Sequence, residues 1–302
     1  MSDILERNHP RPVFRPGRLI SVALVAALVV LIINSLITNP NYHWDKVWEY
    51  LLHPTIIRGI GFTLVLTVAA MFIGVVLAVT MAIMRQSPNP VLKSVAWFYI
   101  WFFRGTPIYT QLIFWGLLPT LYPFVGVGVF KIDINVVWNV LWAAILGLGL
   151  NEGAYLAEIV RAGLNSVDPG QWEAATALGM KRSLIMRRII LPQAMRVIVP
   201  PTGNETISML KTTSLVSAVP FTMELTFAAQ ALGRQIFMPV PMLISAAIWY
   251  LVVTSILMVG QFYLEKHFGK GFNHGGSARV KRRVKESDRT QANPGAFLDV
   301  TP

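Results

Sequence analysis

The sequence predicts an all-α membrane protein with about six transmembrane helices, and three observations support this fold class. Of the 302 residues, 54% are hydrophobic and only 14% are charged, whereas soluble domains carry roughly 25% charged residues. Apolar runs long enough to cross a bilayer as helices recur along the chain. The basic residues gather at the ends of these runs. Together these features favour a multi-pass membrane bundle over a soluble fold.

The first apolar run covers residues 19–38 and contains no charged residue. Four arginines precede it within a basic tail at residues 1–18, an arrangement that imitates a secretory signal: Arg7, Arg11, Arg15 and Arg18. The run is longer than the core of a signal peptide and has no small-x-small cleavage site before Asn39. We therefore predict a retained transmembrane anchor.

Five further spans are predicted at residues 57–84, 106–122, 136–160, 197–220 and 240–264. The third span is short, and the fourth and fifth contain ionisable residues. Gly105 and Pro107 are expected to break the chain between an interfacial helix near residues 91–103 and the third span.

The distribution of basic residues predicts the orientation of these spans. Segments 1–18, 85–104, 161–196 and 265–302 hold 21 Lys and Arg, and segments 39–56, 123–136 and 221–240 hold 3. Cytoplasmic loops keep the positive charge, so both termini are predicted to be cytoplasmic. The basic tail at residues 269–302 lacks any apolar period and is expected to be disordered. It serves either as a topological stop signal or as a binding site for anionic lipid.

Composition also excludes several classes of function. The chain has no cysteine, which rules out disulfides, zinc–thiolate sites and iron–sulfur clusters. The formal charge of +11 does not predict a nucleic-acid partner, because the basic residues flank apolar runs. The sequence G-x-x-x-x-G-K-[ST] is absent, so the chain is not expected to hydrolyse ATP. We expect no enzyme activity, no metal and no cofactor bound by this chain.

The longest internal polar loop, residues 161–196, predicts two short helices. Asp168 can cap a helix that begins at Pro169, with Gln171 reaching back as in a capping box. Gly179 is placed to end this helix. A second helical stretch, residues 182–191, is expected to stop at Pro192. Composition alone would favour an ordinary amphipathic loop on the membrane surface.

The spacing within this loop decides between these readings. It follows the pattern E-A-A-x-x-x-G-x(9)-I-x-L-P at Glu173, Ala174, Ala175, Gly179, Ile189, Leu191 and Pro192. This resembles the coupling loop of importer permeases of the ATP-binding-cassette class. The resemblance implies that these residues dock on a separate cytoplasmic ATPase and transmit its motion to the spans.

Other segments resemble the permeases of polar amino acid importers. They are F-R-G-T-P-x-x-x-Q at residues 102–111, N-x-x-A-Y-x-A-E-I-x-R at 151–161, P-P-x-G-N at 200–204 and K-x-T-S-L at 211–215. The resemblance covers about residues 55–265 and implies that the last five spans form the permease core. It further implies a bacterial inner-membrane location and four kinds of partner: an ATPase dimer that binds ATP and Mg²⁺, a second permease subunit (identical or related), an extracytoplasmic solute-binding protein, and membrane lipid.

Polar residues within the predicted spans are candidates for the translocation path, because charges inside a membrane usually face a cavity or a partner. The candidates are Asn151, Glu152, Glu205, Lys211, Thr212 and Thr213. Glu152 stands where the family leads us to expect a small or hydroxylated residue, and Thr212 stands where Asp or Asn is commoner. A cavity-facing Glu152 would favour a substrate ammonium or guanidinium group. Lys211 either pairs with an acid on a neighbouring helix or contacts substrate.

The segment around the predicted break has two possible roles. Arg104, Gly105, Thr106 and Pro107 lie beside aromatic residues and act either as an interfacial anchor or as a gate. Glu158, near the coupling loop, is expected to make a structural bond.

Two other classes of function would need features of their own in the sequence. An ion-coupled secondary transporter should show an inverted repeat and broken central helices around an ion site. An intramembrane hydrolase or acyltransferase should carry a catalytic set at membrane depth, but the five histidines fall in loops or at span edges. The sequence favours neither alternative.

Overall fold

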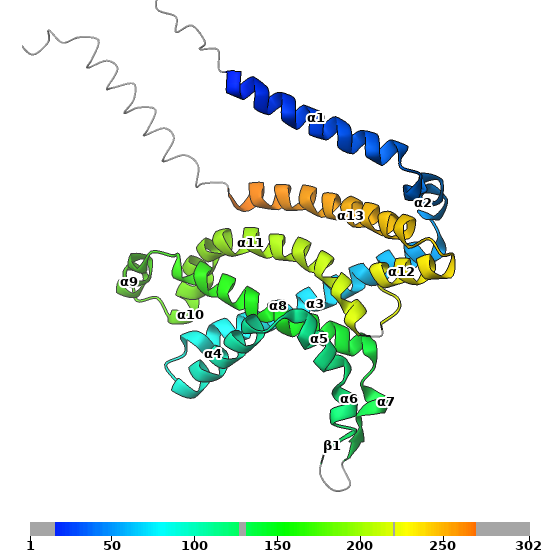
Figure 1. Cartoon of the computed structure of the whole chain (residues 1–302). Coiled ribbons are helices and arrows are strands. Elements are labelled where there is room, and N and C mark those ends of the chain that lie inside the picture. Colours follow the sequence, from blue (N-terminus) through cyan, green and yellow to red (C-terminus); the bar gives the residue numbers. More distant parts are fainter. Residues whose placement is uncertain (1–15, 127–130, 220, 270–302) are drawn as a thin grey trace, which may run out of the picture.

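The structure, a computed structural model, describes residues 16–126, 131–219 and 221–269 (Figure 1). Helices dominate these residues, and one short two-stranded sheet accompanies them. The predicted all-α architecture is therefore observed. Most of the two predicted basic tails, at 1–18 and 269–302, lies outside the described residues.

Two long helices, α3 (Pro54–Gln86) and α8 (Val140–Asn165), form the centre of the bundle. Glycines on α8 let the two backbones approach closely. A Cβ added to Gly149 would lie 2.9 Å from the Cβ of Ile73, and one added to Gly153 would lie 2.8 Å from the Cβ of Leu77. Small residues at helix interfaces allow this dispersion-driven packing in membranes. Buried side chains of both helices, such as Leu66 and Leu148, form the main apolar core.

The later helices pack around this pair. Helix α11 (Leu191–Thr212) contacts α8, and α13 (Pro239–Phe268) contacts α11. Helix α12 (Leu225–Gln235), which precedes α13, contributes to a second apolar cluster with the start of α3. The short helices η1 (Pro40–Tyr42) and α2 (Trp44–Tyr50) pack against α13. Directly after α2, the carbonyl of Leu51 accepts a 2.7 Å hydrogen bond from Trp249 Nε1 of α13.

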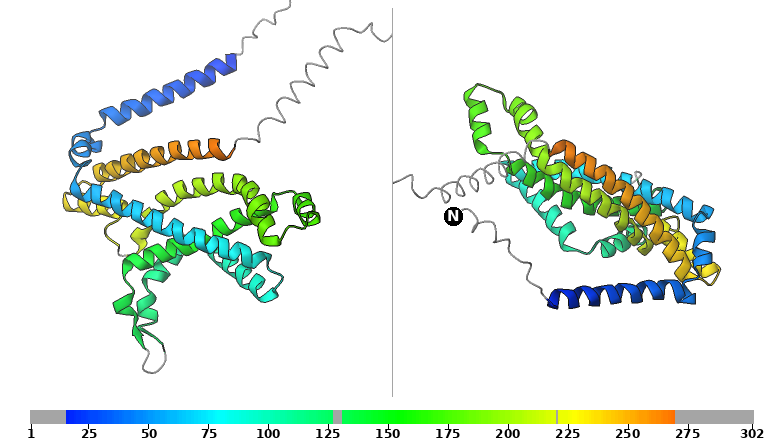
Figure 2. Two further views of the ribbon diagram at one scale, coloured as in Figure 1. Left: turned by 180° about the vertical axis from the view of Figure 1, so that it is seen from behind. Right: turned by 90° about the horizontal axis from the view of Figure 1, so that it is seen from above.

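The first helix, α1 (Pro16–Thr38), stands apart from the bundle (Figures 1 and 2). Its apolar stretch Leu19–Thr38 has none of its residues buried. Trp44 Nε1 donates a 2.7 Å hydrogen bond to the carbonyl of Leu36 at the end of this helix. A helix that is apolar on all sides suits a lipid environment, as predicted for residues 19–38.

Four of the described helices are long and apolar enough to cross a membrane: Leu19–Thr38, Pro54–Gln86, Val140–Asn165 and Pro239–Phe268. The expectation of one continuous third span at 106–122 is wrong. After α4 (Pro90–Gly105) ends, that region holds α5 (Ile108–Gly116) and α6 (Leu118–Leu121). The break between α4 and α5 falls at Thr106 and Pro107, as predicted, because proline cannot supply a helical N–H. The count of six spans stays a prediction.

The predicted fifth span is also irregular. Helix α11 contains Pro200 and Pro201 and continues into the 3₁₀ segment η3 (Thr213–Ala218). Gln261 of α13 donates a 2.8 Å hydrogen bond to the carbonyl of Pro200. The irregular α11 is therefore supported by a side chain from the last helix.

A small hairpin projects from the bundle beyond α5 (Figure 1). Strands β1 (Phe124–Val125) and β2 (Ile132–Asp133) are antiparallel, with Phe124 opposite Asp133. Helix α7 (Ile134–Val137) leads from the hairpin into α8.

Candidate functional site

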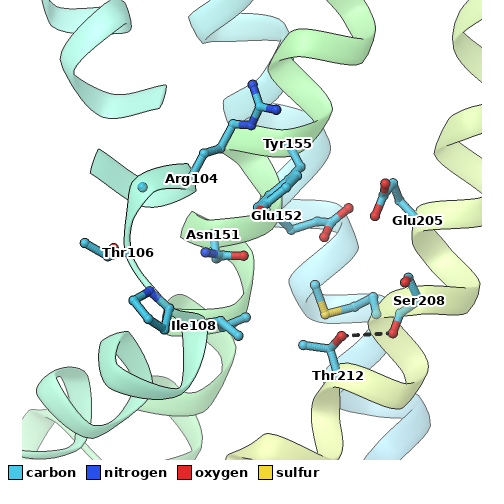
Figure 3. Close-up of a pocket in the computed structure, with 12 residues that line it drawn as sticks. Arg104, Thr106, Ile108, Asn151, Glu152, Tyr155, Glu205, Ser208 and Thr212 are labelled. Atoms are coloured by element: carbon cyan, nitrogen blue, oxygen red, sulfur yellow. Dashed lines mark hydrogen bonds between the residues drawn. The ribbon is translucent and has the colours of Figure 1, made fainter. Parts of the chain in front are cut away.

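A cavity of about 440 Å³ lies where the α4–α5 break faces α8 and α11 (Figure 3). Eight of the residues predicted for the path or the gate line it: Arg104, Gly105, Thr106, Pro107, Asn151, Glu152, Glu205 and Thr212. Four lining residues were not singled out from the sequence: Ile108, Tyr155, Ser208 and Met209. Ser208 could have been found, because it lies at helical spacing between Glu205 and Thr212. We refer to this cavity as the acidic pocket.

Two carboxylates give this pocket its charge. Glu152 projects from α8 and is 5% exposed, and Glu205 projects from α11. Figure 3 shows their carboxyl groups pointing toward each other across the pocket. Among the described residues, Oε1 of Glu152 is the buried side-chain polar atom that lacks a hydrogen-bond partner. A buried carboxylate oxygen without a donor is costly, so the arrangement favours a cationic hydrogen-bond donor between the two acids.

Two amide side chains hold the α4–α5 break in place. Gln111 Nε2 donates to the carbonyls of Phe103 and Thr106, both at 3.0 Å, and to Thr106 Oγ1 at 2.7 Å. Asn151 Nδ2 donates to the carbonyl of Phe103 at 2.9 Å and to Gln111 Oε1 at 3.1 Å. Asn151 therefore lines the pocket, but its amide nitrogen is committed to the break.

This network predicts that Gln111→Leu destabilises the protein. The substitution leaves the carbonyl of Thr106 without its side-chain donor, which should lower the free energy of unfolding by about 1–3 kcal/mol. Thermal unfolding in detergent measures the change, with Thr110→Val on the exposed face of the same helix as control. Equal melting temperatures for the two variants would show that the amide network does not stabilise the break.

Arg104 lies at the edge of the pocket and stacks on an aromatic ring. Its Cζ is 5.3 Å from the ring centroid of Tyr155, within the range of a cation–π interaction. Figure 3 shows the guanidinium group directed away from the two acids.

Two of the predicted path residues lie elsewhere. Thr213 is fully buried and donates a 2.7 Å hydrogen bond to the carbonyl of Leu210, so it supports the turn into η3. Lys211 is exposed and lines a separate groove between α11 and α13, together with Gln261 and Glu265. Its expected pairing with an acid is not formed in the described part of the chain, where the ion pairs are Lys46–Glu49 and Arg161–Glu158.

Glu158 makes the structural bond expected of it. It accepts hydrogen bonds from Arg161 Nη2 at 2.6 Å and from Arg161 Nε at 3.0 Å, three residues further along α8. This ion pair lies within the last turns of α8, at the end of the helix that leads into the loop.

The first half of the predicted loop folds as expected. Helix α9 (Pro169–Ala177) begins with Asp168 Oδ1 accepting a 2.7 Å hydrogen bond from the Gly170 N–H. Gly179 has φ of +73°, a left-handed conformation that suits glycine at a helix end. The expected capping box is wrong, because the described hydrogen bond of Gln171 Oε1 comes from Gln193 at 3.4 Å.

The second half differs from the prediction. Helix α10 (Arg182–Ile185) passes through a π-helical turn, η2 (Met186–Ile190), straight into α11. The expected stop at Pro192 is wrong: proline sits in the first turn of α11, where its missing N–H is tolerated, and the wider π turn leaves room for its ring.

The loop has its own small core and an exposed outer surface. Ala175, Ile185 and Ile190 are buried in the core, and Ile189 is half-buried against it. Glu173, Ala174, Gly179, Leu191 and Pro192 are exposed, and so is Leu178 at 81%. Ala175 therefore has a structural role, whereas the exposed members form a surface at the end of the bundle, called the docking surface below.

Sequence reasoning missed one buried carboxylate, Glu224. It is completely buried before α12, and its oxygens accept hydrogen bonds from Thr63 Oγ1 of α3 at 3.0 Å, from the Tyr250 hydroxyl of α13, and from the Thr226 N–H at 2.7 Å. Glu224 thus joins three helices. The available sequence signal was an acid directly before a helix, the position of an N-cap.

Comparison with known families decides the identity of the chain. Residues 70–270 match the family described as the binding-protein-dependent transport system inner membrane component. The chain belongs to this family. The arginine transport system permease protein ArgU of Corynebacterium glutamicum is 53% identical to this permease over 279 residues, which cover 92% of the permease and 88% of ArgU.

Two further comparisons agree with this assignment. The octopine transport system permease protein OccM of Rhizobium meliloti is 40% identical over 215 residues, which cover 69% of the permease and 83% of OccM. A crystal structure of an amino acid ABC transporter with histidines superimposes with a TM-score of 0.60 at 36% identity, covering 71% of the permease and 94% of that chain.

The family match confirms the resemblance predicted from the sequence. The permease is a multi-pass component of the inner membrane and a transport subunit rather than an enzyme. Membership implies an ATPase and a binding protein as partners. The comparisons give no support to an ion-coupled secondary transporter.

Proposed function

We propose that the permease forms the translocation path for a cationic amino acid that carries a guanidinium or second ammonium group. The observation that carries this proposal is the pair of facing acids, Glu152 and Glu205. A guanidinium group presents several N–H donors in a plane and can bond carboxylates through two of them at once. Such a group between the two acids would supply the missing donor to Oε1 of Glu152.

The relatives support the same class of substrate. ArgU, at 53% identity, is an arginine transport permease by name. OccM is an octopine transport permease by name, and the superimposed structure belongs to an amino acid transporter. We propose that this permease, like these relatives, transports an amino acid.

A second permease subunit, identical or related, is proposed to cover the exposed polar side of α11. Asn204, Ser208 and Lys211 recur on this side at helical spacing and are all exposed. Polar groups facing hydrocarbon are costly, so residues of this kind face a partner or a water-filled cavity. The path would then run between two such subunits.

The remaining partners follow from the docking surface and the predicted orientation. An ATPase dimer, which holds ATP and Mg²⁺, would bind the docking surface from the cytoplasm, where both termini also lie. A solute-binding protein would deliver the amino acid on the opposite side. Closure of the ATPase dimer would switch the acidic pocket between outward and inward access, a two-state change driven by partner contacts.

Glu152→Gln tests this function. We expect uptake of arginine to fall about tenfold, because a charge-assisted hydrogen bond contributes about 1.5–3 kcal/mol. Uptake is measured in proteoliposomes that hold the permease with its ATPase and binding protein, with arginine and glutamine as substrates. Glu49→Gln, on the exposed side of α2, serves as the matched control. Unchanged uptake of both substrates by Glu152→Gln would refute the proposal.

A further inference from the structure

A second cavity adjoins the acidic pocket and shares a wall with it. It has a volume of about 470 Å³ and is lined by Arg85, Trp97, Ile100, Trp101 and Glu158, together with three residues that also line the acidic pocket. These three are Arg104, Gly105 and Tyr155. The stacked pair of Arg104 and Tyr155 therefore lies between the two cavities.

The second cavity lies on the docking-surface side of the acidic pocket. Glu152, Tyr155 and Glu158 follow one another along α8 at intervals of three residues, and α8 ends shortly before α9. A molecule that leaves the acidic pocket toward the docking surface passes Tyr155 before it reaches Glu158. The wall is thus placed across the inward half of the proposed path.

The two cavities carry opposite charge. The acidic pocket contains Glu152 and Glu205, whereas the second cavity contains Arg85, with its one acid, Glu158, already bound to Arg161, and Arg104 lies on the wall that the two cavities share. A cation is attracted by the first cavity and repelled at the entrance to the second. Gly105 leaves space at this entrance, because a Cβ added there would meet no atom within 4 Å.

Arg104 is held loosely enough to move. Among the described residues its side chain stacks on Tyr155, with the Cζ 5.3 Å from the ring centroid, and is attracted at longer range by the carboxylate of Glu158. The Arg104 side chain is exposed, and it makes no ion pair in the described part of the chain. A single stacking contact of this kind is weak in an exposed position.

We propose that Arg104, positioned by Tyr155, is a charge filter at the inward end of the acidic pocket. In this conformation its guanidinium group slows the passage of cations between the two cavities, and displacement of Arg104 from Tyr155 lets the substrate leave. The inference rests on the proposed path through the acidic pocket and adds a specificity-determining residue to it. The filter also keeps cytoplasmic cations out of the pocket after release.

The absence of native cysteine allows a direct test, since one introduced cysteine is the only thiol of the permease. Thr212→Cys places this thiol in the acidic pocket. In inside-out vesicles that hold the permease with its ATPase, the thiol is labelled with two membrane-impermeant methanethiosulfonates, one with a quaternary ammonium group and one with a sulfonate group. The measured quantity is the ratio of the two labelling rates, ammonium over sulfonate.

Adding Arg104→Gln should raise this ratio about tenfold, because loss of one positive charge lowers the barrier for the ammonium reagent and raises the barrier for the sulfonate reagent. Arg104→Lys and Tyr155→Phe should leave the ratio near its starting value, since they keep the charge and the ring respectively. Lys93→Gln removes the same charge from an exposed position on α4 and should also leave it unchanged.

Labelling requires neither substrate nor ATP turnover, so this result is independent of the arginine uptake assay. An unchanged ratio in Arg104→Gln would overturn the filter and leave Arg104 as an interfacial anchor. Equal acceleration of both reagents would also overturn it, because it would show a steric plug without charge selection. A similar rise with Lys93→Gln would assign the effect to overall charge.

Discussion

Glu224→Ala is expected to lower the free energy of unfolding of the permease by about 3–5 kcal/mol. The substitution removes the acceptor of three donors and leaves the hydroxyls of Thr63 and Tyr250 buried without it. It also removes the N-cap of α12, which costs about 1 kcal/mol in comparable helices. A drop in melting temperature in detergent, measured beside loss of assembled protein in the membrane, would report the change.

Two companion variants sharpen this experiment. Glu224→Gln keeps one acceptor oxygen and should lose less stability than Glu224→Ala. Glu49→Ala removes a carboxylate from an exposed pair with Lys46 and should change the melting temperature little. If the melting temperatures of Glu224→Ala and Glu49→Ala are the same, the buried carboxylate does not hold α3, α12 and α13 together.

Gly179→Leu is expected to reduce uptake about 30-fold or more while the permease stays folded, because a disrupted hot spot at an interface costs 2 kcal/mol or more. Gly179 has φ of +73°, where a side chain such as leucine is strained, and it lies on the exposed docking surface. Glu173→Lys should act in the same direction by reversing the charge of an exposed residue on the docking surface. Uptake and ATP hydrolysis are measured together in proteoliposomes.

Gly179→Asn provides the matched control, because asparagine tolerates the left-handed conformation. We expect it to retain most of the uptake. Coupled transport at the native rate in Gly179→Leu would show that this surface does not carry the ATPase contact. Loss of folding in Gly179→Leu, detected by its melting temperature, would instead assign the effect to backbone strain.

Much of the fold could be predicted because its signals are local. The uncharged run at 19–38 and the long apolar helices depend on composition alone, and the break at Thr106 and Pro107 depends on the chemistry of proline. Asp168 and Gly179 bound α9 through neighbouring backbone groups. The pattern of the loop could therefore be recognised before its three-dimensional form.

What the sequence did not reveal depends on contacts between distant residues. Gln111 and Asn151 support the α4–α5 break from 40 positions apart, and Glu224 meets Thr63 and Tyr250 from separate helices. Lys211 is predicted either to pair with an acid on a neighbouring helix or to contact substrate, but it lies in a groove with Glu265, outside the acidic pocket, and forms no ion pair in the described part of the chain. Pro192 predicts a helix stop that the structure does not have, because a π-helical turn leaves no simple mark in a sequence.

The unbroken course from α10 through η2 into α11 has a mechanical consequence. The same continuous helix carries Leu191 and Pro192 at one end and Glu205 and Thr212 further along, with Pro200 and Pro201 between them. A displacement of the outer end is therefore passed along α11, and the wall of the acidic pocket that carries Glu205 moves with it. The facing carboxylate, Glu152, lies on α8, which also leads into the loop, and the α4–α5 break beside it is held by Gln111 and Asn151. The distance between the facing carboxylates, and with it the grip on a cation, would then be set from outside the membrane core.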